Sequence, residues 1–151
     1  NQPSDQQLNL RGKLFRSFDQ SGLTETPQYD FKGNVKISNR KIASEYKQVA
    51  DWNVADPMLL LETDNFGGGA LFDALNRATE VQLPDGSKIH QAYNEAGLLE
   101  QMHVFVQKQN QNITFVQHID YNAKAQRKLL LYGNNTAPRY AYEEKTDPLQ
   151  R

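Results

Sequence analysis

The chain has 151 residues, and its 17 basic and 18 acidic side chains leave a net charge of −1. A charge so close to zero provides no single-sign field that would attract nucleic acid or an anionic membrane. The chain contains no cysteine, which excludes disulfides, zinc–thiolate sites and cysteine nucleophiles.

The balance of residue types favours exposed β-sheet over a thick core. Hydrophobic residues make up 38% of the chain, which is low for a self-sufficient globule, and aromatic residues reach 10%, which is too high for a disordered chain. No stretch approaches the roughly 18 apolar residues that a transmembrane helix needs. The chain lacks an initiator Met and an obvious cap at its end. We therefore expect residues 1–151 to be a single segment of a longer chain.

The first predicted elements form a β-hairpin. Residues 11–18 and 23–29 are its strands, and Asp19-Gln20-Ser21-Gly22 is the turn between them. Gly22 supplies the positive φ that a tight turn requires. The N-terminal part of the chain is therefore predicted to be β-structure from residue 11 onward.

The next segment breaks the alternating pattern. Ile42, Tyr46 and Val49 are spaced by 4 and 3 residues, as on one face of a helix. We predict a short helix near residues 39–50, and a strand that continues from Val35 is the alternative.

The stretch from residue 51 to residue 69 has no clear period and is predicted to be irregular. Trp52 is the sole Trp of the chain, and we expect it to anchor the preceding helix on the sheet. Gly67-Gly68-Gly69 lacks the Gly-Lys-Ser/Thr ending of a phosphate-binding loop, so it is predicted to be a flexible turn.

The second half of the chain alternates apolar and polar residues, which predicts further hairpins. Pro84-Asp85-Gly86-Ser87 is a strong turn signal, because Pro presets φ and Gly accepts the left-handed step. The polar stretch 107–112 is predicted to be a mobile hairpin loop. The predicted strands are residues 79–83, 88–93, 99–106, 113–121, 127–132 and 139–142.

A short unit recurs five times, although at irregular intervals of 11, 43, 21 and 28 residues. It consists of an aromatic residue, Asp or Asn, two further residues, and Gly or a substitute. The aromatic residue ends a strand, the Asp or Asn side chain bonds the turn backbone, and the last residue takes the left-handed conformation. The predicted structural repeat-corner residues are Phe18, Asp19, Gly22, Tyr29, Asp30, Gly33, Phe72, Asp73, Asn76, Tyr93, Asn94, Gly97, Tyr121 and Asn122.

Two units depart from this pattern at their last residue. Asn76 and Ala125 stand where the other units have Gly. Asn adopts the left-handed conformation readily, whereas Ala does so poorly. We therefore expect the unit that ends at Ala125 to be a diverged copy.

These units resemble the YD repeats of the Rhs family. The order of the runs is similar to that in the shell-forming B and C components of bacterial insecticidal toxin complexes, and the resemblance spans roughly residues 9–147. It implies an all-β fold in which antiparallel β-hairpin (YD) repeats form a curved sheet that is part of a larger shell. The runs that carry the resemblance are 29–34, 72–77, 83–87, 119–124, 131–134 and 139–142.

The resemblance also implies a function. The chain would be a non-catalytic structural segment whose sheet forms wall around a toxic cargo, in a secreted or cell-surface bacterial virulence protein. Its partners would be the remaining YD-repeat shell and the enclosed toxin domain, and open edge strands predict self-association. The alternative is an extracellular module that binds carbohydrate or protein through exposed tyrosines, with Tyr132, Tyr140 and Tyr142 as the candidate stacking residues.

A metal centre is the first chemical alternative. His118 and Asp120 are two residues apart on one predicted strand, and His90 or His103 would complete a ligand set. None of these spacings is diagnostic, so they are interpreted as ordinary sheet-surface residues. No metal and no cofactor are predicted.

Catalysis by paired carboxylates is the second alternative. The irregular stretch contains Asp51, Asp56, Glu62 and Asp64. Acidic residues in loops are usually solvated, and no nucleophile elbow of the Gly-x-Ser-x-Gly type is present. The sequence therefore predicts a protein that is not an enzyme.

Overall fold

The computed structural model describes residues 3–143 and 149, which fall into two compact units, Asn1–Gly86 and Ser87–Arg151. Residues 144–147, the end of the span that resembles YD repeats, lie outside the described residues. Within the described part, each unit consists of antiparallel strands that follow one another in chain order. No helix among these residues has the length and apolarity needed to cross a membrane.

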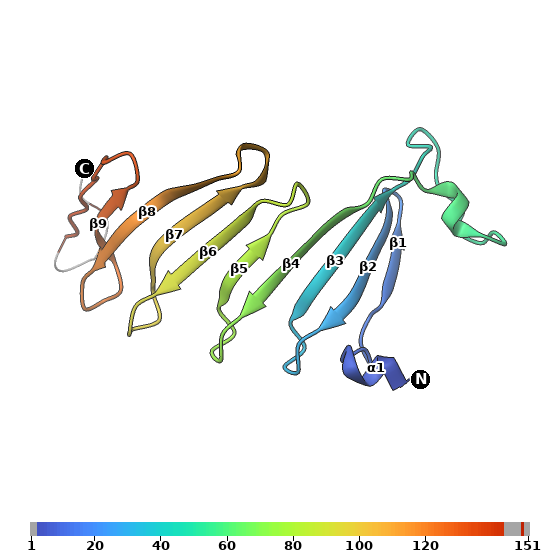
Figure 1. Ribbon diagram of the computed structural model, residues 1–151, viewed down its shortest axis with the longest axis horizontal. Coiled ribbons are helices and arrows are strands. Elements are labelled where there is room, and N and C mark those ends of the chain that lie inside the picture. Colours follow the sequence, from blue (N-terminus) through green and yellow to red (C-terminus); the bar gives the residue numbers. More distant parts are fainter. Residues whose placement is uncertain (1–2, 144–148, 150–151) are drawn as a thin grey trace. The chain divides into compact units, whose positions relative to one another are not determined.

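The first unit is a meander of strands (Figure 1). Each strand pairs with the next, so that β2, β3 and β4 each have a neighbour on both sides. The elements are α1 (Pro3–Gln7), β1 (Arg16–Asp19), β2 (Gly22–Tyr29), β3 (Val35–Ile42), the 3-10 helix η1 (Pro57–Leu60), β4 (Phe66–Phe72) and β5 (Ala78–Gln82).

The second unit repeats this arrangement with β6 (Lys88–Tyr93), β7 (Leu99–Val106), the 3-10 helix η2 (Gln107–Gln109), β8 (Gln111–Tyr121) and β9 (Arg127–Tyr132). After β9 the chain turns back along that strand. The N–H of Leu130 donates to the carbonyl of Pro138 at 3.1 Å, and the N–H of Tyr140 donates to the carbonyl of Lys128 at 2.9 Å. The returning segment therefore covers part of the β9 edge.

The predicted fold class, an all-β chain of antiparallel hairpins, is confirmed. The strands predicted at 88–93, 99–106 and 127–132 have these same bounds in the structure. The turn at Pro84–Ser87 also forms, because the N–H of Gly86 donates to the carbonyl of Leu83 at 3.0 Å with φ of +82° at Gly86.

The helix predicted near residues 39–50 is wrong, and the alternative strand from Val35 is found instead. Ile37 pairs with Gln28 of β2 on one side and with Gly69 of β4 on the other. Two-sided pairing satisfies the backbone groups of β3 with partners distant in sequence, and this outweighs a local helical spacing. The strand ends at Ile42, and the residues that follow are irregular as far as η1.

The flexible turn predicted at Gly67–Gly69 is also wrong, since these residues lie inside β4. A Cβ atom at Gly69 would lie 2.5 Å from the carbonyl oxygen of Lys36, and one at Gly68 would lie 2.9 Å from the carbonyl oxygen of Gln82. Glycine in a strand interior often marks such a close approach of another backbone. The Gly run therefore allows β4 to lie close against β3 and β5.

Few side chains are buried among the described residues. In the first unit these include Leu23, Tyr29 and Ala43. In the second unit, Val116, Ile119 and Leu130 form a small cluster on which partly buried side chains pack. These thin cores agree with the low hydrophobic content of the chain.

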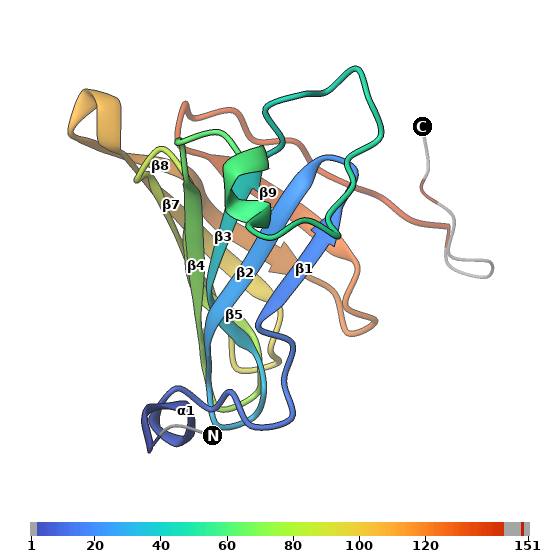
Figure 2. The same cartoon turned by 90° about the vertical axis from the view of Figure 1, so that its right-hand side faces the viewer.

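The N-terminal segment closes one end of the first unit (Figures 1 and 2). The N–H of Tyr29 donates to the carbonyl of Leu8 at 3.1 Å, and the Tyr29 hydroxyl donates to the carbonyl of Leu14 at 2.6 Å. Tyr29 therefore holds α1 and the chain that follows it against the end of β2.

Candidate functional site: the repeated hairpin corners

Four hairpin corners share one backbone geometry. In the β2–β3 corner, the N–H of Asp30 donates to the carbonyl of Asn34 at 2.9 Å, and the N–H of Gly33 donates to the carbonyl of Asp30 at 3.1 Å. The equivalent bonds, 2.9–3.1 Å long, recur in the corners that begin at Asp73, Asn94 and Asn122.

The fourth residue of each corner has a left-handed backbone. Its φ is +93° at Gly33, +63° at Asn76, +80° at Gly97 and +61° at Ala125. A type I turn followed by a left-handed residue is the usual three-residue hairpin loop, and it produces a bulge in the ladder. Ala125 is the costly member of the set, because its Cβ disfavours this conformation by roughly 1–2 kcal/mol.

The first side chain of each corner bonds the turn backbone. Oδ1 of Asp30 accepts the N–H groups of Lys32 at 2.9 Å and Asn34 at 2.8 Å. Oδ1 of Asn122 accepts the N–H groups of Lys124 at 2.9 Å and Gln126 at 3.0 Å. A carboxylate and an amide oxygen therefore perform the same role, as expected of an Asx turn.

The corner aromatics mark the bulges. Each of them pairs with the residue six positions later, directly after a shift in register: Tyr29 with Val35, Phe72 with Ala78, Tyr93 with Leu99, and Tyr121 with Arg127. The repeat in the sequence therefore corresponds to a repeat in strand register.

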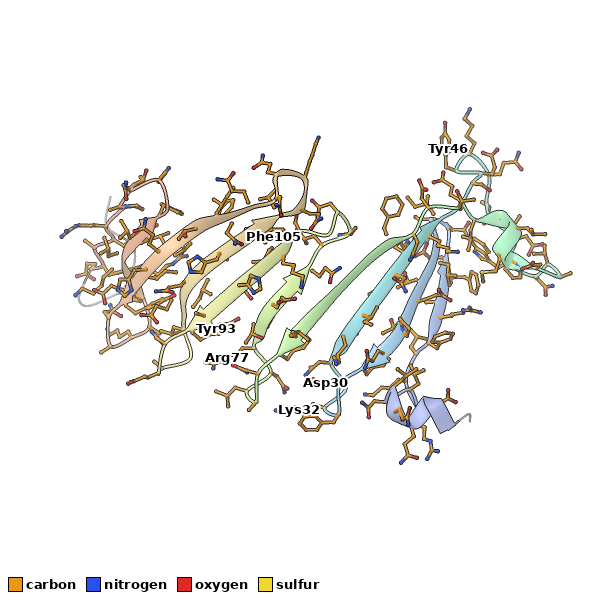
Figure 3. All side chains as sticks on the ribbon, in the orientation of Figure 1. Asp30, Lys32, Tyr46, Arg77, Tyr93 and Phe105 are labelled. Carbon is orange, nitrogen blue, oxygen red and sulfur yellow. The ribbon has the colours of Figure 1, made fainter. Side chains whose placement is uncertain are left out.

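Neighbouring corners are bonded to each other within each unit. In the first unit, Nδ2 of Asn34 donates to Oδ1 of Asn76 at 3.1 Å, and Nζ of Lys32 donates to the carbonyl of Ala74. Figure 3 shows Asp30, Lys32 and Arg77 at the same end of the strands. In the second unit, the Tyr121 hydroxyl donates to the carbonyl of Leu99 at 2.7 Å. Within each unit, the two corners are therefore joined and are not isolated turns.

Hydrogen bonds and burial shift the pKa values at these corners. The backbone N–H of Arg77 and then its guanidinium, 2.7 Å from Oδ2, lower the pKa of Asp73. Burial acts to raise the pKa of Asp30, but the hydrogen bonds from Asn34, Lys32 and Gly33 together outweigh it and lower the pKa overall. Burial raises the pKa of Tyr121, against the opposing charge of Arg127.

The unit at Phe18 forms a different turn. Asp19 pairs directly with Gly22, which leaves Gln20 and Ser21 as a two-residue loop, and φ of Gly22 is +136°. Because β2 runs from Gly22 to Tyr29, this turn lies at the opposite end of β2 from the corner at Asp30.

The 43 residues between Tyr29 and Phe72 contain two strands, β3 and β4, as do the shorter intervals of 21 and 28 residues. The additional length lies in residues 43–65, which connect β3 to β4 and include η1. The interval of 43 residues is therefore long because of this one connection, and it does not contain an additional pair of hairpins.

The turn that the sequence predicts after residues 127–132 forms one more corner of the same kind, although the repeat pattern did not include it. The N–H of Tyr132 donates to the carbonyl of Thr136 at 2.9 Å, and the N–H of Asn135, whose φ is +65°, donates to the carbonyl of Tyr132 at 3.0 Å. Here Tyr takes the place of Asp or Asn, and Oδ1 of Asn134 accepts the N–H of Thr136 at 3.0 Å instead. The run Gly133-Asn134-Asn135 was the available signal.

The candidate metal ligands are not brought together as a set of three. His90 and His103 are cross-strand partners on β6 and β7. His118 lies beside Glu100, with Nδ1 3.5 Å from Oε1, and Asp120 pairs with Leu129. Among the residues that the structure describes, no group of three His, Asp or Glu side chains is arranged to hold a metal ion.

Two acidic residues of the irregular stretch bond the backbone of their own turns. Oδ1 of Asp51 accepts the N–H of Asn53 at 3.0 Å, and Oδ1 of Asp56 accepts the N–H of Met58 at 3.0 Å. Asp56 thereby caps η1. Both carboxylates support local turns of the backbone.

The three candidate stacking tyrosines lie near the end of the second unit. Tyr132 is exposed, at 36%, and begins the corner described above. Tyr140 packs on the Val116 cluster, with the guanidinium carbon of Arg127 5.9 Å from the centroid of its ring. Tyr142 is half-buried and forms a bridge with Leu149.

Comparison with known proteins identifies a fold. No protein-family model matches the chain, and no curated protein matches it. A crystal structure of TcdB2-TccC3 aligns with 99% of this chain at a TM-score of 0.92 and 22% identity. The Photorhabdus luminescens Tc holotoxin pore aligns with 98% of it at a TM-score of 0.91 and 22% identity. This chain spans 7% of the length of each, and it shares the fold of that segment of a Tc toxin.

Proposed function

We propose that this chain is a non-catalytic structural segment of a YD/Rhs-repeat protein of the toxin type, in which its sheet forms wall around an enclosed cargo. The observation that carries the proposal is the recurrence of one corner geometry on successive hairpins. The alignment of nearly the whole chain with a segment of Tc toxin structures supports it.

The corner residues are assigned a structural role in this proposal. The side-chain oxygen at the first corner position satisfies the N–H groups of the turn, and the left-handed residue reverses the chain without a long loop. In the four shared corners these residues are Tyr29, Asp30, Gly33, Phe72, Asp73, Asn76, Tyr93, Asn94, Gly97, Tyr121 and Asn122. Phe18, Asp19 and Gly22 are assigned a structural role in the separate two-residue turn between β1 and β2.

The thin cores also support a wall segment. A sheet with few buried side chains gains limited free energy from its own hydrophobic contacts, and it is stabilised by further sheet on its edges. The proposed partners are the remaining repeats of a longer parent chain and the toxin domain that they enclose. The proposed location, secreted or on the bacterial surface, follows from the same family resemblance.

Sedimentation across a concentration series, with circular dichroism on the same samples, tests this proposal. A wall segment with open edges should remain rich in β-structure and associate as its concentration rises, because unpaired strand edges pair with other copies. A compact β monomer whose size is independent of concentration would contradict the proposal and favour a self-contained module.

A further inference from the structure

The connection between β3 and β4, residues 43–65, is held in a defined shape and is here called the 43–65 loop. At its base, both the N–H and the hydroxyl of Ser44 donate to the carbonyl of Leu60, at 2.9 and 3.0 Å. The N–H of Glu62 donates to the carbonyl of Ile42 at 2.8 Å. The two arms of the loop are therefore paired where they leave the sheet.

The middle of the loop is attached to the β1–β2 turn. The ring of Trp52 lies 5.0 Å from that of Phe18, and its Nε1 donates to the carbonyl of Asp19 at 3.2 Å. The N–H of Ala50 donates to Oε1 of Gln20 at 2.9 Å. As expected from the sequence, Trp52 anchors this segment on the sheet, although the segment is not a helix.

This ordered loop exposes large apolar side chains. Tyr46 is 81% exposed, Val49 84% and Leu59 81%. Figure 3 shows Tyr46 at the outer tip of the loop, away from the strands of its unit. Exposed large apolar side chains on a fixed backbone are typical of interaction surfaces, since their burial against a partner is favourable.

A surface pocket of about 240 Å³ opens between the arms of the loop. Its apolar walls include Ala43, Val54 and Leu60, whereas Glu45 and Asp51 contribute carboxylates. An apolar pocket with charged groups beside it fits the insertion of one apolar side chain that is flanked by charged neighbours.

The loop is acidic, so the charged neighbours of the inserted side chain are expected to be basic. The loop contains five acidic residues and a single Lys, whereas the whole chain is nearly neutral. Within the part of the chain that the structure describes, none of these five carboxylates forms an ion pair with a basic side chain. The acidic residues are Glu45, Asp51, Asp56, Glu62 and Asp64.

We propose that the 43–65 loop is a docking surface for a protein segment that inserts an apolar side chain into this pocket and places Lys or Arg residues against the surrounding carboxylates. Nucleic acid and anionic membranes are disfavoured because they carry the same sign of charge as the loop. The same loop also exposes Tyr46 and Leu59 outside the residues that line the pocket, which fits a peptide better than a small molecule.

Binding of synthetic peptides to the full chain tests this proposal. The sole Trp lies in the loop directly after Asp51, which lines the pocket, so its fluorescence is used as the readout of binding. The probes are short peptides with a central Leu or Phe flanked by Lys and Arg, and the same peptides with Glu in place of the basic residues. We expect the basic set to bind at least about tenfold more tightly, which corresponds to ~1.4 kcal/mol, and to weaken as salt rises.

Two pairs of variants separate the apolar and charged contributions. Val49→Ser should weaken binding of the basic peptides, whereas Phe31→Ser, which changes a side chain that is also 84% exposed but lies in the β2–β3 corner, should not. The double variant Glu45→Gln with Asp51→Asn should weaken binding, and Glu95→Gln in the second unit should not. Equal binding of both peptide sets, or equal effects of loop and control variants, would overturn the proposal.

Discussion

The smallest scale at which this protein can be understood is the single corner residue. Asp and Asn occupy the first position of the corners interchangeably, because both present an oxygen that accepts backbone N–H groups. Gly, Asn and Ala occupy the fourth position with the same sign of φ but at different conformational cost.

Ala125 provides a direct test of that cost. We expect Ala125→Gly to stabilise the chain by roughly 1 kcal/mol, because Gly relieves the left-handed strain and its greater freedom in the unfolded state offsets only part of the gain. The free energy of unfolding in urea measures the effect. Asn76→Gly is the control and should change stability less, since Asn tolerates this conformation. A destabilised Ala125→Gly variant would contradict the assignment.

The oxygen at the first corner position provides a second test. Asp73→Asn keeps the turn acceptor, as Asn94 and Asn122 do, and loses the ion pair with Arg77, so it should cost less than about 1 kcal/mol. Asp73→Ala leaves the N–H groups of Leu75 and Arg77 without this acceptor, and we expect it to cost about 1–3 kcal/mol in the free energy of unfolding. Equal effects of the two substitutions would indicate that the side chain does not support the turn.

At the scale of the element, contacts between strands determine conformations that the local sequence pattern does not specify. The side chain of Arg40 in β3 bonds Asp19 at the end of β1, with Nη2 2.6 Å from Oδ1. The Gly run of β4 is accommodated between the backbones of β3 and β5. Both features join segments that are distant in sequence.

The Arg40–Asp19 pair predicts a dependence of stability on pH. The side-chain bond from Arg40, with the N–H of Ser21, lowers the pKa of Asp19 from 3.8 to about 2. A lowered carboxyl pKa contributes stability above the unfolded value, which is lost as pH falls through the folded value. Thermal unfolding between pH 4 and pH 2 should therefore show a decline that Asp19→Asn reduces. Asp64→Asn, at an exposed loop carboxylate, should leave the decline unchanged.

Gly69 predicts an effect of steric crowding between strands. The Cβ of Gly69→Ala would meet the Lys36 carbonyl at 2.5 Å, so we expect a loss of about 1–3 kcal/mol in the free energy of unfolding. Gly12→Ala is the comparison, since no heavy atom lies within 4 Å and only its φ of +69° opposes the change. If Gly69→Ala were the milder substitution, the close approach of β3 and β4 would be refuted.

At the scale of the whole molecule, few side chains are buried, so each one contributes a large share of the free energy of unfolding. Leu130 is 4% exposed and belongs to the small cluster with Val116 and Ile119. Small domains are stabilised by only about 5–15 kcal/mol in total. The loss of one such side chain therefore removes a large fraction of the stability of the second unit.

Leu130→Ala should consequently lower the free energy of unfolding by roughly 2–5 kcal/mol. Chemical denaturation monitored by circular dichroism measures this change. Leu75→Ala makes the same change at a side chain that is 70% exposed, and it should stay within about 0.5 kcal/mol of the parent. Similar effects at both positions would mean that the cluster does not act as a core.

The sequence by itself determined four of the hairpin corners, those that begin at Asp30, Asp73, Asn94 and Asn122. The Asx bonds and the left-handed residue involve neighbours within five positions, so the run Tyr29-Asp30 to Asn34 carries all the information that its turn needs. The short apolar and β-prone runs of β6, β7 and β9 were equally local signals, and these strands have the predicted bounds.

Only the tertiary structure decided the identity of β3, the strand conformation of Gly67–Gly69 and the bonds between neighbouring corners. In each case the deciding groups come from another strand or corner. Gln28 and Gly69 pair with Ile37, and the carbonyl of Lys36 lies beside Gly69. Asn76 of one corner bonds Asn34 of the next. Helical spacing and a Gly run are local signals, and backbone pairing with distant strands outweighs them because buried N–H and C=O groups must be satisfied.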